Sequence, residues 1–192
     1  FQPDLCFNLM EEYDGDPLMD SNVVAYLEMI GLPYTGSNPK GLTLARDKSL
    51  SKKILEYHGL PTPKHFVVKK SCRPKKSEQY NYPLFVKSLS EEASYGISQA
   101  SLVKSYEALC SRVEFIHKKI GTDAIVDEFI EGRELYLALM GNKKIVDFPL
   151  WEMDFGELSE SHQKIASRNT KWNESYRKKN KIDVHRAKDI PP

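Results

Sequence analysis

The chain has 192 residues, of which 40% are hydrophobic and 29% charged, as in an ordinary globular protein. Its 28 basic and 27 acidic residues give a net charge of +1, so no overall field would draw it onto nucleic acid or an anionic membrane. No apolar run approaches the roughly 18 residues that a membrane span needs. We therefore expect neither nucleic acid nor membrane as a partner.

The chain begins at Phe1 without a methionine and runs directly into an apolar segment, so we expect part of a longer protein. Its cysteines, Cys6, Cys72 and Cys110, are odd in number and widely spaced. This favours free thiols and a cytoplasmic setting. Cys6 and Cys110 stand in apolar stretches and are expected to be buried.

The first lobe, expected over residues 1–62, has the strand, loop, helix order of an α/β layer. Residues 4–9 are a short apolar run typical of a buried strand. A first helix is indicated by apolar side chains at helical spacing, Val23, Leu27 and Ile30. Gly31 ends it. The predicted class is α/β (α+β).

A second helix is expected over residues 44–58, ended by Gly59. Its predicted core stripe consists of Leu50, Ile54 and Tyr57. Two prolines, Pro61 and Pro63, then form a rigid connector that we interpret as the boundary between two lobes.

The second lobe, expected over residues 63–153, is predicted to be an antiparallel sheet backed by one long helix at 106–120. The expected strands are 65–69, 84–87, 102–103, 124–130, 133–140 and 144–150, with a tight hairpin turn at Gly141-Asn142. The basic run at 73–76 is typical of a solvated loop. Residues 154–192 are polar with little periodicity, which indicates either a lid or a disordered stretch.

Two lysines stand out by their settings. Lys87 closes the apolar strand Leu84-Phe-Val, where a cation needs an anionic partner, and Lys48 stands near the start of a helix beside Asp47. Each also has a simple structural explanation, a lysine whose charged end reaches solvent or a weak surface ion pair.

The loop that follows Lys87, residues 88–98, is small, polar and hinged on Gly96. Such a loop can close over a polyphosphate with backbone N–H groups and hydroxyls. It is not a Walker loop, because no G-x-x-x-x-G-K-[ST] occurs in the sequence.

Carboxylates flank an apolar pair in V-D-E-F-I-E-G-R-E at 126–134. An adenine needs an acceptor and an apolar slot, and a ribose needs a carboxylate. Alternation would place Asp127 and Phe129 on one face and Glu128 and Ile130 on the other. The alternative is a solvated hairpin whose acidic residues protect a sheet edge.

Together these segments resemble the ATP-grasp superfamily, specifically the D-alanine–D-alanine ligases. The matching motifs, in order, are G-L-P-Y-T-G-S at 31–37, A-R-D-K at 45–48 continuing to Lys52, G-L-P-T-P at 59–63, L-F-V-K at 84–87, S-Y-G-I-S at 94–98 and D-E-F-I-E-G-R-E at 127–134. A weaker similarity continues through N-T-K-W at 169–172, so the resemblance covers nearly the whole chain. It implies that residues 154–192 hold a mobile loop and the start of the C-terminal ATP-grasp lobe.

The resemblance implies roles for named residues. Lys48 and Lys87 would contact the phosphates of ATP, and Ser94, Tyr95 and Gly96 would form the phosphate loop. Asp127 would face the adenine amino group, with the backbone of Glu128 and Ile130 and the ring of Phe129 around the base, and Glu134 would hold the ribose. Lys171 would reach the terminal phosphate, so that Lys171 and Ser94 would be catalytic.

The implied reaction is an ATP-dependent carboxylate–amine ligation through an acyl phosphate, on small amino-acid or peptide substrates. The resemblance allows a homodimer. It also implies magnesium, held by an Asp and a later Glu-x-Asn. No Glu-x-Asn occurs in these 192 residues, so no metal ligand is assigned here, and this chain alone is expected to bind nucleotide without completing catalysis.

Two departures from the family's pattern concern the loops. The usual serine pair is Ala93-Ser94, and the usual Tyr after the second loop's lysine is Trp172. An alternative function is therefore a non-catalytic module that binds a nucleotide or a partner. A nucleic-acid site at R-K-K-N-K, residues 177–181, is a weaker alternative because only Tyr176 could stack there.

Overall fold

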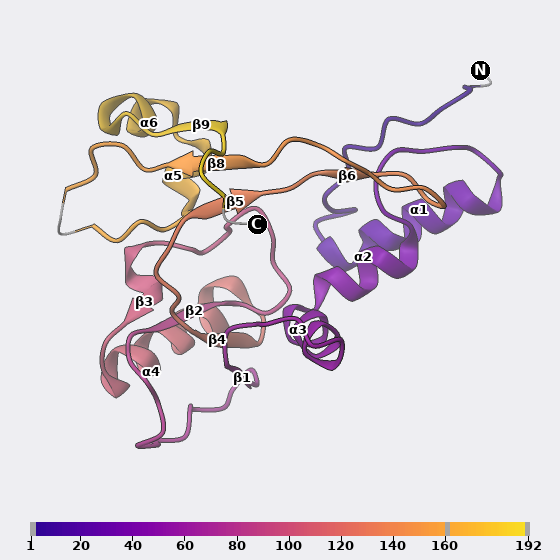
Figure 1. Ribbon diagram of the computed structural model, residues 1–192. Coiled ribbons are helices and arrows are strands. Elements are labelled where there is room, and N and C mark those ends of the chain that lie inside the picture. Colours follow the sequence, from indigo (N-terminus) through magenta and orange to yellow (C-terminus); the bar gives the residue numbers. More distant parts are fainter. Residues whose placement is uncertain (1–2, 160–161, 191–192) are drawn as a thin grey trace.

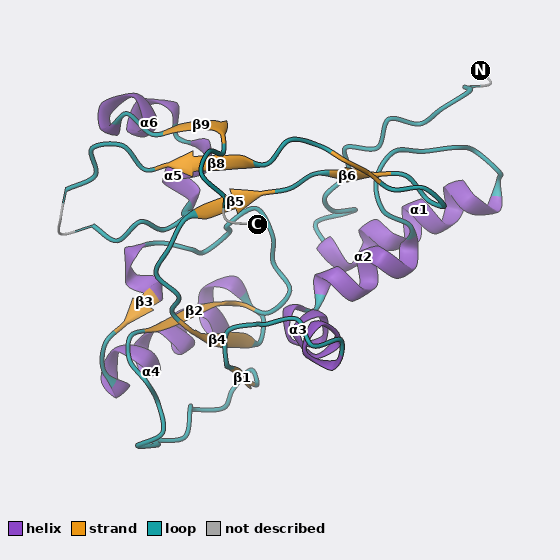
Figure 2. Ribbon diagram, in the orientation of Figure 1, coloured by secondary structure: helices purple, strands orange, loops and turns teal. Residues whose placement is uncertain are grey.

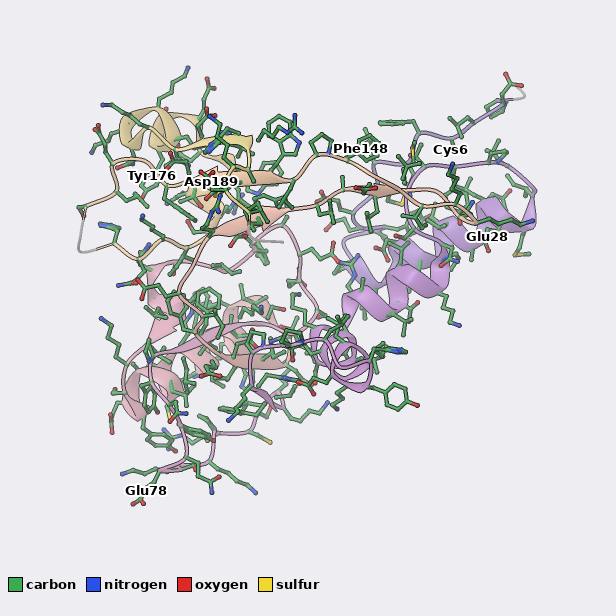
Figure 3. All side chains as sticks on the ribbon, viewed as in Figure 1. Cys6, Glu28, Glu78, Phe148, Tyr176 and Asp189 are labelled. Atoms are coloured by element: carbon green, nitrogen blue, oxygen red, sulfur yellow. The ribbon has the colours of Figure 1, made fainter. Side chains whose placement is uncertain are left out.

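The computed structural model describes residues 3–159 and 162–190. Figure 1 shows the helices of the first part on one side, a sheet with its helix below, and a second set of strands and helices above. Figure 2 shows how long loops connect these parts. Cys6 and Glu28 lie at one end of the molecule, and Tyr176 and Asp189 at the other (Figure 3).

The first part is helical, with a short 3-10 turn, η1 (Pro17–Met19), before α1 (Asp20–Met29), α2 (Pro39–Arg46) and α3 (Lys48–Tyr57). The first predicted helix is confirmed as α1, which Gly31 follows at φ +69. The predicted single helix at 44–58 is wrong, because the chain breaks at Asp47 with ψ 98. The Asp47 carboxylate then accepts hydrogen bonds from the backbone N–H groups of Ser49 and Leu50, which starts α3.

The predicted core stripe of this helix is also wrong. Tyr57 is 87% exposed and Leu50 is exposed as well. The buried residue of α3 is Ser49, and Lys52 on the same helix reaches Asp127. The inward face of α3 therefore makes polar contacts with the sheet, and apolar periodicity could not indicate it.

The expected buried strand at residues 4–9 is wrong. Cys6 forms one isolated parallel bridge with Tyr34, and Leu9 is 77% exposed. A single bridge provides no second layer against which apolar side chains could pack. Cys6 and Cys110 are only half-buried, so their predicted burial is partial, and all three cysteines are free as expected.

The central sheet has the strand order β1-β4-β2-β3 and is antiparallel throughout. Its strands are β1 (His65–Val68), β2 (Leu84–Ser88), β3 (Leu102–Val103) and β4 (Ala124–Glu128). The turn η2 (Gln99–Ser101) precedes β3. The predicted long helix is confirmed as α4 (Tyr106–Phe115), which continues as a π-type turn, η3 (Ile116–Ile120).

The core lies between this sheet and α4. Val86 and Val126 from the sheet and Leu109, Val113 and Ile116 from the helix are essentially inaccessible to solvent. Fully burying each such side chain contributes roughly 1.5–3 kcal/mol. This core fixes the ends of β2 and β4, where the candidate site begins.

The strands after β4 leave the central sheet, contrary to the expectation of one antiparallel sheet. The expected strands at 133–140 and 144–150 are replaced by β5 (Glu134–Tyr136), β6 (Leu139–Met140), β7 (Val146–Asp147) and β8 (Trp151–Asp154). β5 pairs with β8, and β6 pairs with β7 in a separate hairpin. Successive strands need not belong to the same sheet, and the periodicity of a strand does not indicate which sheet it joins.

The described residues after 154 form regular elements, so the expectation of a lid or a disordered stretch missed α5 (Arg168–Trp172), α6 (Glu174–Asn180) and β9 (Asp183–Arg186). β9 completes the sheet β5-β8-β9, whose core contains Met153, Phe155 and Ile182. Helices this short do not contain enough residues to show a repeating pattern of apolar side chains in the sequence. Over the described residues, no helix is long and apolar enough to cross a membrane.

Candidate functional site

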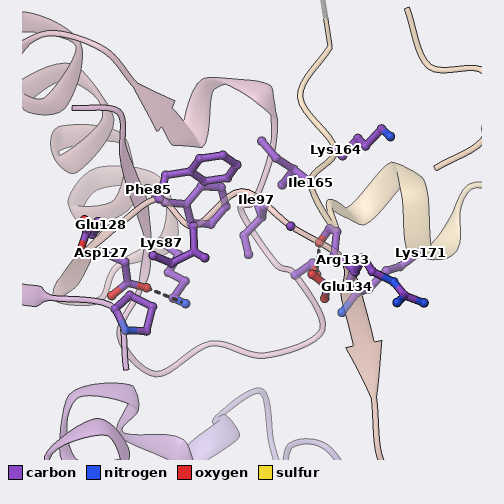
Figure 4. Close-up of a pocket in the computed structure, with 16 residues that line it drawn as sticks. Phe85, Lys87, Ile97, Asp127, Glu128, Arg133, Glu134, Lys164, Ile165 and Lys171 are labelled. Atoms are coloured by element: carbon purple, nitrogen blue, oxygen red, sulfur yellow. Dashed lines mark hydrogen bonds and ion pairs between the residues drawn. The ribbon is translucent and has the colours of Figure 1, made fainter. Parts of the chain in front are cut away.

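A cavity of about 430 Å³ lies where β2 and β4 end, between the loop after β2 and the segment 162–172 (Figure 4). This volume falls within the roughly 300–1,000 Å³ of small-molecule sites. Its apolar lining comes from Phe85, Ile97, Phe129, Ile130 and Ile165. Its cationic side chains are Lys87, Arg133, Lys164 and Lys171. Such a combination suits a flat apolar group joined to an anion.

Most of the residues predicted from the sequence are brought together here, namely Lys87, Ser94, Asp127, Glu128, Phe129, Ile130, Glu134 and Lys171. The predicted alternation of 127–130 ends with β4 at Glu128, and all four residues therefore line the cavity. The residues outside its lining are Lys48, Tyr95 and Gly96.

Asp127 is the charged centre of the site and is only 4% exposed. Its Oδ2 lies 2.9 Å from Lys87 Nζ, and its Oδ1 lies 2.5 Å from Lys52 Nζ. Figure 4 shows the carboxylate of Asp127 directed at Lys87. Two ammonium groups on one carboxylate leave one positive charge in excess, so the cluster is neutralised only when an anion joins it.

Lys52 was not among the predicted site residues. Burial lowers its pKa, which the hydrogen bond to Asp127 partly offsets. The available signal was its spacing, because Lys52 follows Lys48 by four residues and positions i and i+4 share a helix face.

Lys48 begins α3 and holds the loop that follows β2. Its Nζ donates hydrogen bonds to the carbonyls of Leu89, at 3.3 Å, and Glu91. Burial, and then the charge of Lys87, lower the pKa of Lys48 to about 8. Both causes disfavour its cationic form, and an incoming anion would favour it.

The loop itself contains backbone in the left-handed region. Ala93 and Ser94 have φ of +51 and +62, and Gly96 has φ of +73. The φ of Gly96 favours glycine, and a Cβ there would lie 2.9 Å from Cδ1 of Ile120, so an L residue would also require the Ile120 side chain to shift. Tyr95 is exposed, and its N–H donates to the carbonyl of Glu92.

On the apolar side of the cavity, the rings of Phe85 and Phe129 contact each other, with centroids 6.2 Å apart at an angle of 34°. The N–H groups of Glu128 and Phe129 donate to the carbonyls of Lys64 and Pro83. These bonds fix the chain where it turns from the central sheet towards β5.

Glu134 and Lys171 stand at the other end of the cavity beside Tyr136. The Tyr136 hydroxyl donates a hydrogen bond to Glu134 Oε1 at 3.1 Å, and Lys171 Nζ lies 5.5 Å from the centre of the Tyr136 ring. Burial, reinforced by the Glu134 charge, raises the pKa of Tyr136, so its hydroxyl stays protonated and remains a donor. Glu134 therefore keeps free acceptor capacity on the cavity side.

The acidic residues do not form a metal site in the part of the chain that the structure describes. Over residues 3–159 and 162–190, no group of three or more His, Cys, Asp or Glu side chains could hold a metal ion. Magnesium takes oxygen ligands in near-octahedral geometry, and the side chains described here do not provide such a set.

A family model described as "D-ala D-ala ligase C-terminus" matches residues 53–185. Protein y4sG of Sinorhizobium fredii is 36% identical over 153 residues, covering 80% of this chain and 44% of that protein. A D-alanine–D-alanine ligase of Pelotomaculum thermopropionicum is 31% identical over 159 residues, covering 78% and 48%. The chain thus spans about half the length of these curated relatives.

Solved structures show the same likeness. The VanG D-Ala:D-Ser ligase of Enterococcus faecalis aligns with a TM-score of 0.64 at 25% identity, covering 80% of this chain and 44% of that one. A Bacillus anthracis D-alanine–D-alanine ligase complexed with ATP aligns at 0.61 with 26% identity, covering 78% and 48%. Another structure of the Bacillus anthracis enzyme covers 99% of this chain at 20% identity, with a TM-score of 0.66, which supports the fold.

Proposed function

This chain belongs to the D-alanine–D-alanine ligase family and has its ATP-grasp fold, and from that premise we propose that the cavity binds ATP. We further propose that the whole protein joins a carboxylate to an amine at the expense of ATP. The observation that carries the proposal is the Lys52–Asp127–Lys87 cluster, which has one excess positive charge and lies at the same cavity as the aromatic pair Phe85 and Phe129.

The base and ribose would occupy the apolar side of the cavity. Phe85 and Phe129 would hold the adenine ring, with the backbone of Glu128 and Ile130 at its edge. A carboxylate offers about four acceptor sites, so Asp127 can accept from two lysines and still accept from an adenine amino group. Glu134 would accept hydrogen bonds from the ribose hydroxyls.

The phosphates would extend towards the lysines. Lys87 and Lys48 would neutralise them from the sheet and from α3, and the loop with Ser94, Tyr95 and Gly96 would cover them with backbone N–H groups. Lys171 would approach the terminal phosphate from α5. These placements spread positive charge along the anion and hold it for in-line transfer.

In the proposed reaction, a substrate carboxylate oxygen attacks the terminal phosphorus and ADP leaves, which gives an acyl phosphate. An amine nitrogen then attacks the acyl carbon, phosphate leaves, and a carbon–nitrogen bond forms. The lysines hold the transferring group, and the covering segments keep water from the acyl phosphate. We assign no metal ligand among the described residues.

The relatives' names indicate the substrate class. They are D-alanine–D-alanine ligases and a D-Ala:D-Ser ligase, so we propose D-amino acids as substrates of the whole protein. The three free cysteines fit a reducing, cytoplasmic compartment.

The test is unfolding temperature with and without a non-hydrolysable ATP analogue and magnesium chloride. Ligand at about 100 times its dissociation constant should add about 2.7 kcal/mol of stability. Lys87→Met should abolish the shift, whereas Lys104→Met, at an exposed position between β3 and α4, should keep it. Absence of any shift in the unaltered protein would refute the nucleotide site.

A second measurement separates a ligase from a binding module. The full-length protein is incubated with ATP and D-alanine, and the release of ADP and phosphate is followed. Release that depends on D-alanine supports ligation. Binding of ATP without such release would leave a nucleotide-binding module and refute the proposed reaction.

A further inference from the structure

Segment 96–101, the end of the loop after β2, is anchored from the core by Arg112 on α4. Arg112 is only 7% exposed, and its guanidinium donates hydrogen bonds to the carbonyl of Gly96 and, at 2.8 Å, to Ser101 Oγ. Ser101 Oγ also accepts from the N–H of Ser98 at 3.2 Å. Both ends of this segment are therefore fixed before anything docks on its outer side.

From this fixed segment, the side chain of Gln99 reaches the backbone of Gln163. Gln99 Nε2 donates to the carbonyl of Gln163 at 2.9 Å, and the N–H of Gln163 donates to Gln99 Oε1 at 3.0 Å. The side-chain amide thus pairs with both polar groups of one residue's backbone, as a neighbouring strand would. The side chain of Gln163 takes no part in either bond.

Two more hydrogen bonds join the same segments in the direction of the cavity. Ser94 Oγ donates to the carbonyl of Ala166 at 2.7 Å, and the indole Nε1 of Trp172 donates to the carbonyl of Ala93 at 3.1 Å. Ala166 and Lys171 both line the cavity. Docking of the second segment on the first therefore decides where the ammonium of Lys171 lies.

We propose that Gln99 is a positioning residue, which holds segment 162–172 by the backbone of Gln163 and thereby keeps Lys171 at the end of the cavity that Glu134 lines. What Lys171 does there rests on the proposed function, whereas the docking does not. Because Gln99 binds backbone groups, the side chain at 163 is free to vary without loss of docking.

The direct test is amide hydrogen exchange of peptides covering 162–172 in Gln99→Ala, compared with Gln163→Ala. Gln99→Ala removes both bonds, each worth roughly 0.5–1.5 kcal/mol, so exchange should accelerate about tenfold or more. Gln163→Ala keeps both backbone groups and should exchange as the unaltered protein does. Gln99→Glu keeps the acceptor but loses the donor, so its exchange should be intermediate.

The consequence for ligand binding is measured with ATP and AMP. Gln99→Ala should raise the dissociation constant of ATP about tenfold, because the docked state becomes less populated. AMP lacks the terminal phosphate that Lys171 would contact, so its dissociation constant should change by less than about twofold.

The two proposals fail in different ways. Unchanged exchange in Gln99→Ala, or accelerated exchange in Gln163→Ala, would overturn the role of Gln99 whether or not ATP binds. Accelerated exchange with equal weakening of ATP and AMP would show that docking occurs but does not position Lys171, and would overturn the inference as well. Failure of the unaltered protein to bind ATP would refute the nucleotide site and leave the exchange result to decide docking.

Discussion

The ammonium of Lys52 on α3 lies 2.5 Å from Oδ1 of Asp127 on β4, and it joins the helical first part of the chain to the central sheet. The same carboxylate holds Lys87 through its other oxygen. Lys52 neutralises Asp127, which leaves the charge of Lys87 available to an anion. The Lys52–Asp127 pair therefore contributes both to the contact between the two parts and to the electrostatics of the cavity.

Lys52→Met should destabilise the fold and also weaken ATP binding. A buried ion pair that loses one partner costs several kcal/mol, but Asp127 keeps Lys87, so we expect about 1–3 kcal/mol. Urea unfolding measures this value. Lys53→Met, at the next and exposed position, is the matched control and should change stability by less than about 0.5 kcal/mol. Equal stability of the two variants would contradict a structural role for the Lys52–Asp127 pair.

The pKa of Lys48 predicts how ATP affinity depends on pH. With a pKa of about 8, Lys48 is cationic below this pH and loses its charge above it. Phosphate favours the cationic form, so affinity should be level up to about pH 8 and then fall by up to about tenfold per pH unit. Lys48→Arg remains charged and should remove this dependence. A pH profile that is the same in both proteins would exclude Lys48 from the phosphate site.

Most residues proposed for the candidate site could be picked out from the sequence because each motif is local. The apolar strand ending at Lys87, the loop with Gly96 and the carboxylates at 127–134 are readable over a few residues each, and most of these residues meet at one cavity. Lys52 was missed because its partner, Asp127, is 75 residues away in the sequence. A buried lysine and an exposed one cannot be told apart until the fold brings the carboxylate beside one of them.

The fold was less predictable where partners are distant. The break at Asp47 depends on its side chain capping α3, whereas helical periodicity suggests one continuous helix. The path from β4 to β5 depends on pairing with β8, which lies beyond the expected strands, and β9 on the other side of β8 comes from the polar stretch after residue 154. The packing of α4 against the sheet was predicted correctly, because the helix is long enough for its apolar side chains to show a clear helical repeat in the sequence.

Trp172 offers a prediction about the second loop. Its indole N–H donates to the carbonyl of Ala93, so the contact between the loops needs no hydroxyl on either residue. Trp172→Phe removes one bond worth roughly 0.5–1.5 kcal/mol and should weaken ATP binding about two- to tenfold. Trp151→Phe, on β8, is the control and should leave the affinity for ATP unchanged. Isothermal titration calorimetry measures both variants without relying on tryptophan fluorescence. Unchanged affinity in Trp172→Phe would show that the bond does not contribute to binding.

Gly96 allows steric and backbone effects to be separated. Gly96→Ala places a Cβ 2.9 Å from Cδ1 of Ile120 and also forces an L side chain to φ +73. Gly31→Ala meets the same φ problem, at +69, with no atom within 4 Å, so it measures the backbone effect alone, about 1–2 kcal/mol. Gly96→Ala should cost about 0.5–1.5 kcal/mol more, because the Ile120 side chain would have to leave its preferred rotamer.

Ile120→Val removes the Cδ1 atom, which at 2.9 Å is the nearest to the new Cβ, and leaves Cγ1 at 3.1 Å. In the double variant Gly96→Ala/Ile120→Val, the excess over Gly31→Ala should decrease, after allowing about 0.5–1.5 kcal/mol for Ile120→Val alone. Chemical denaturation of the unaltered protein, Gly96→Ala, Ile120→Val and the double variant gives the coupling, and Gly31→Ala gives the reference for the backbone effect. An additive result would mean that Ile120 does not restrict the loop, and that Gly96 is needed for its φ alone.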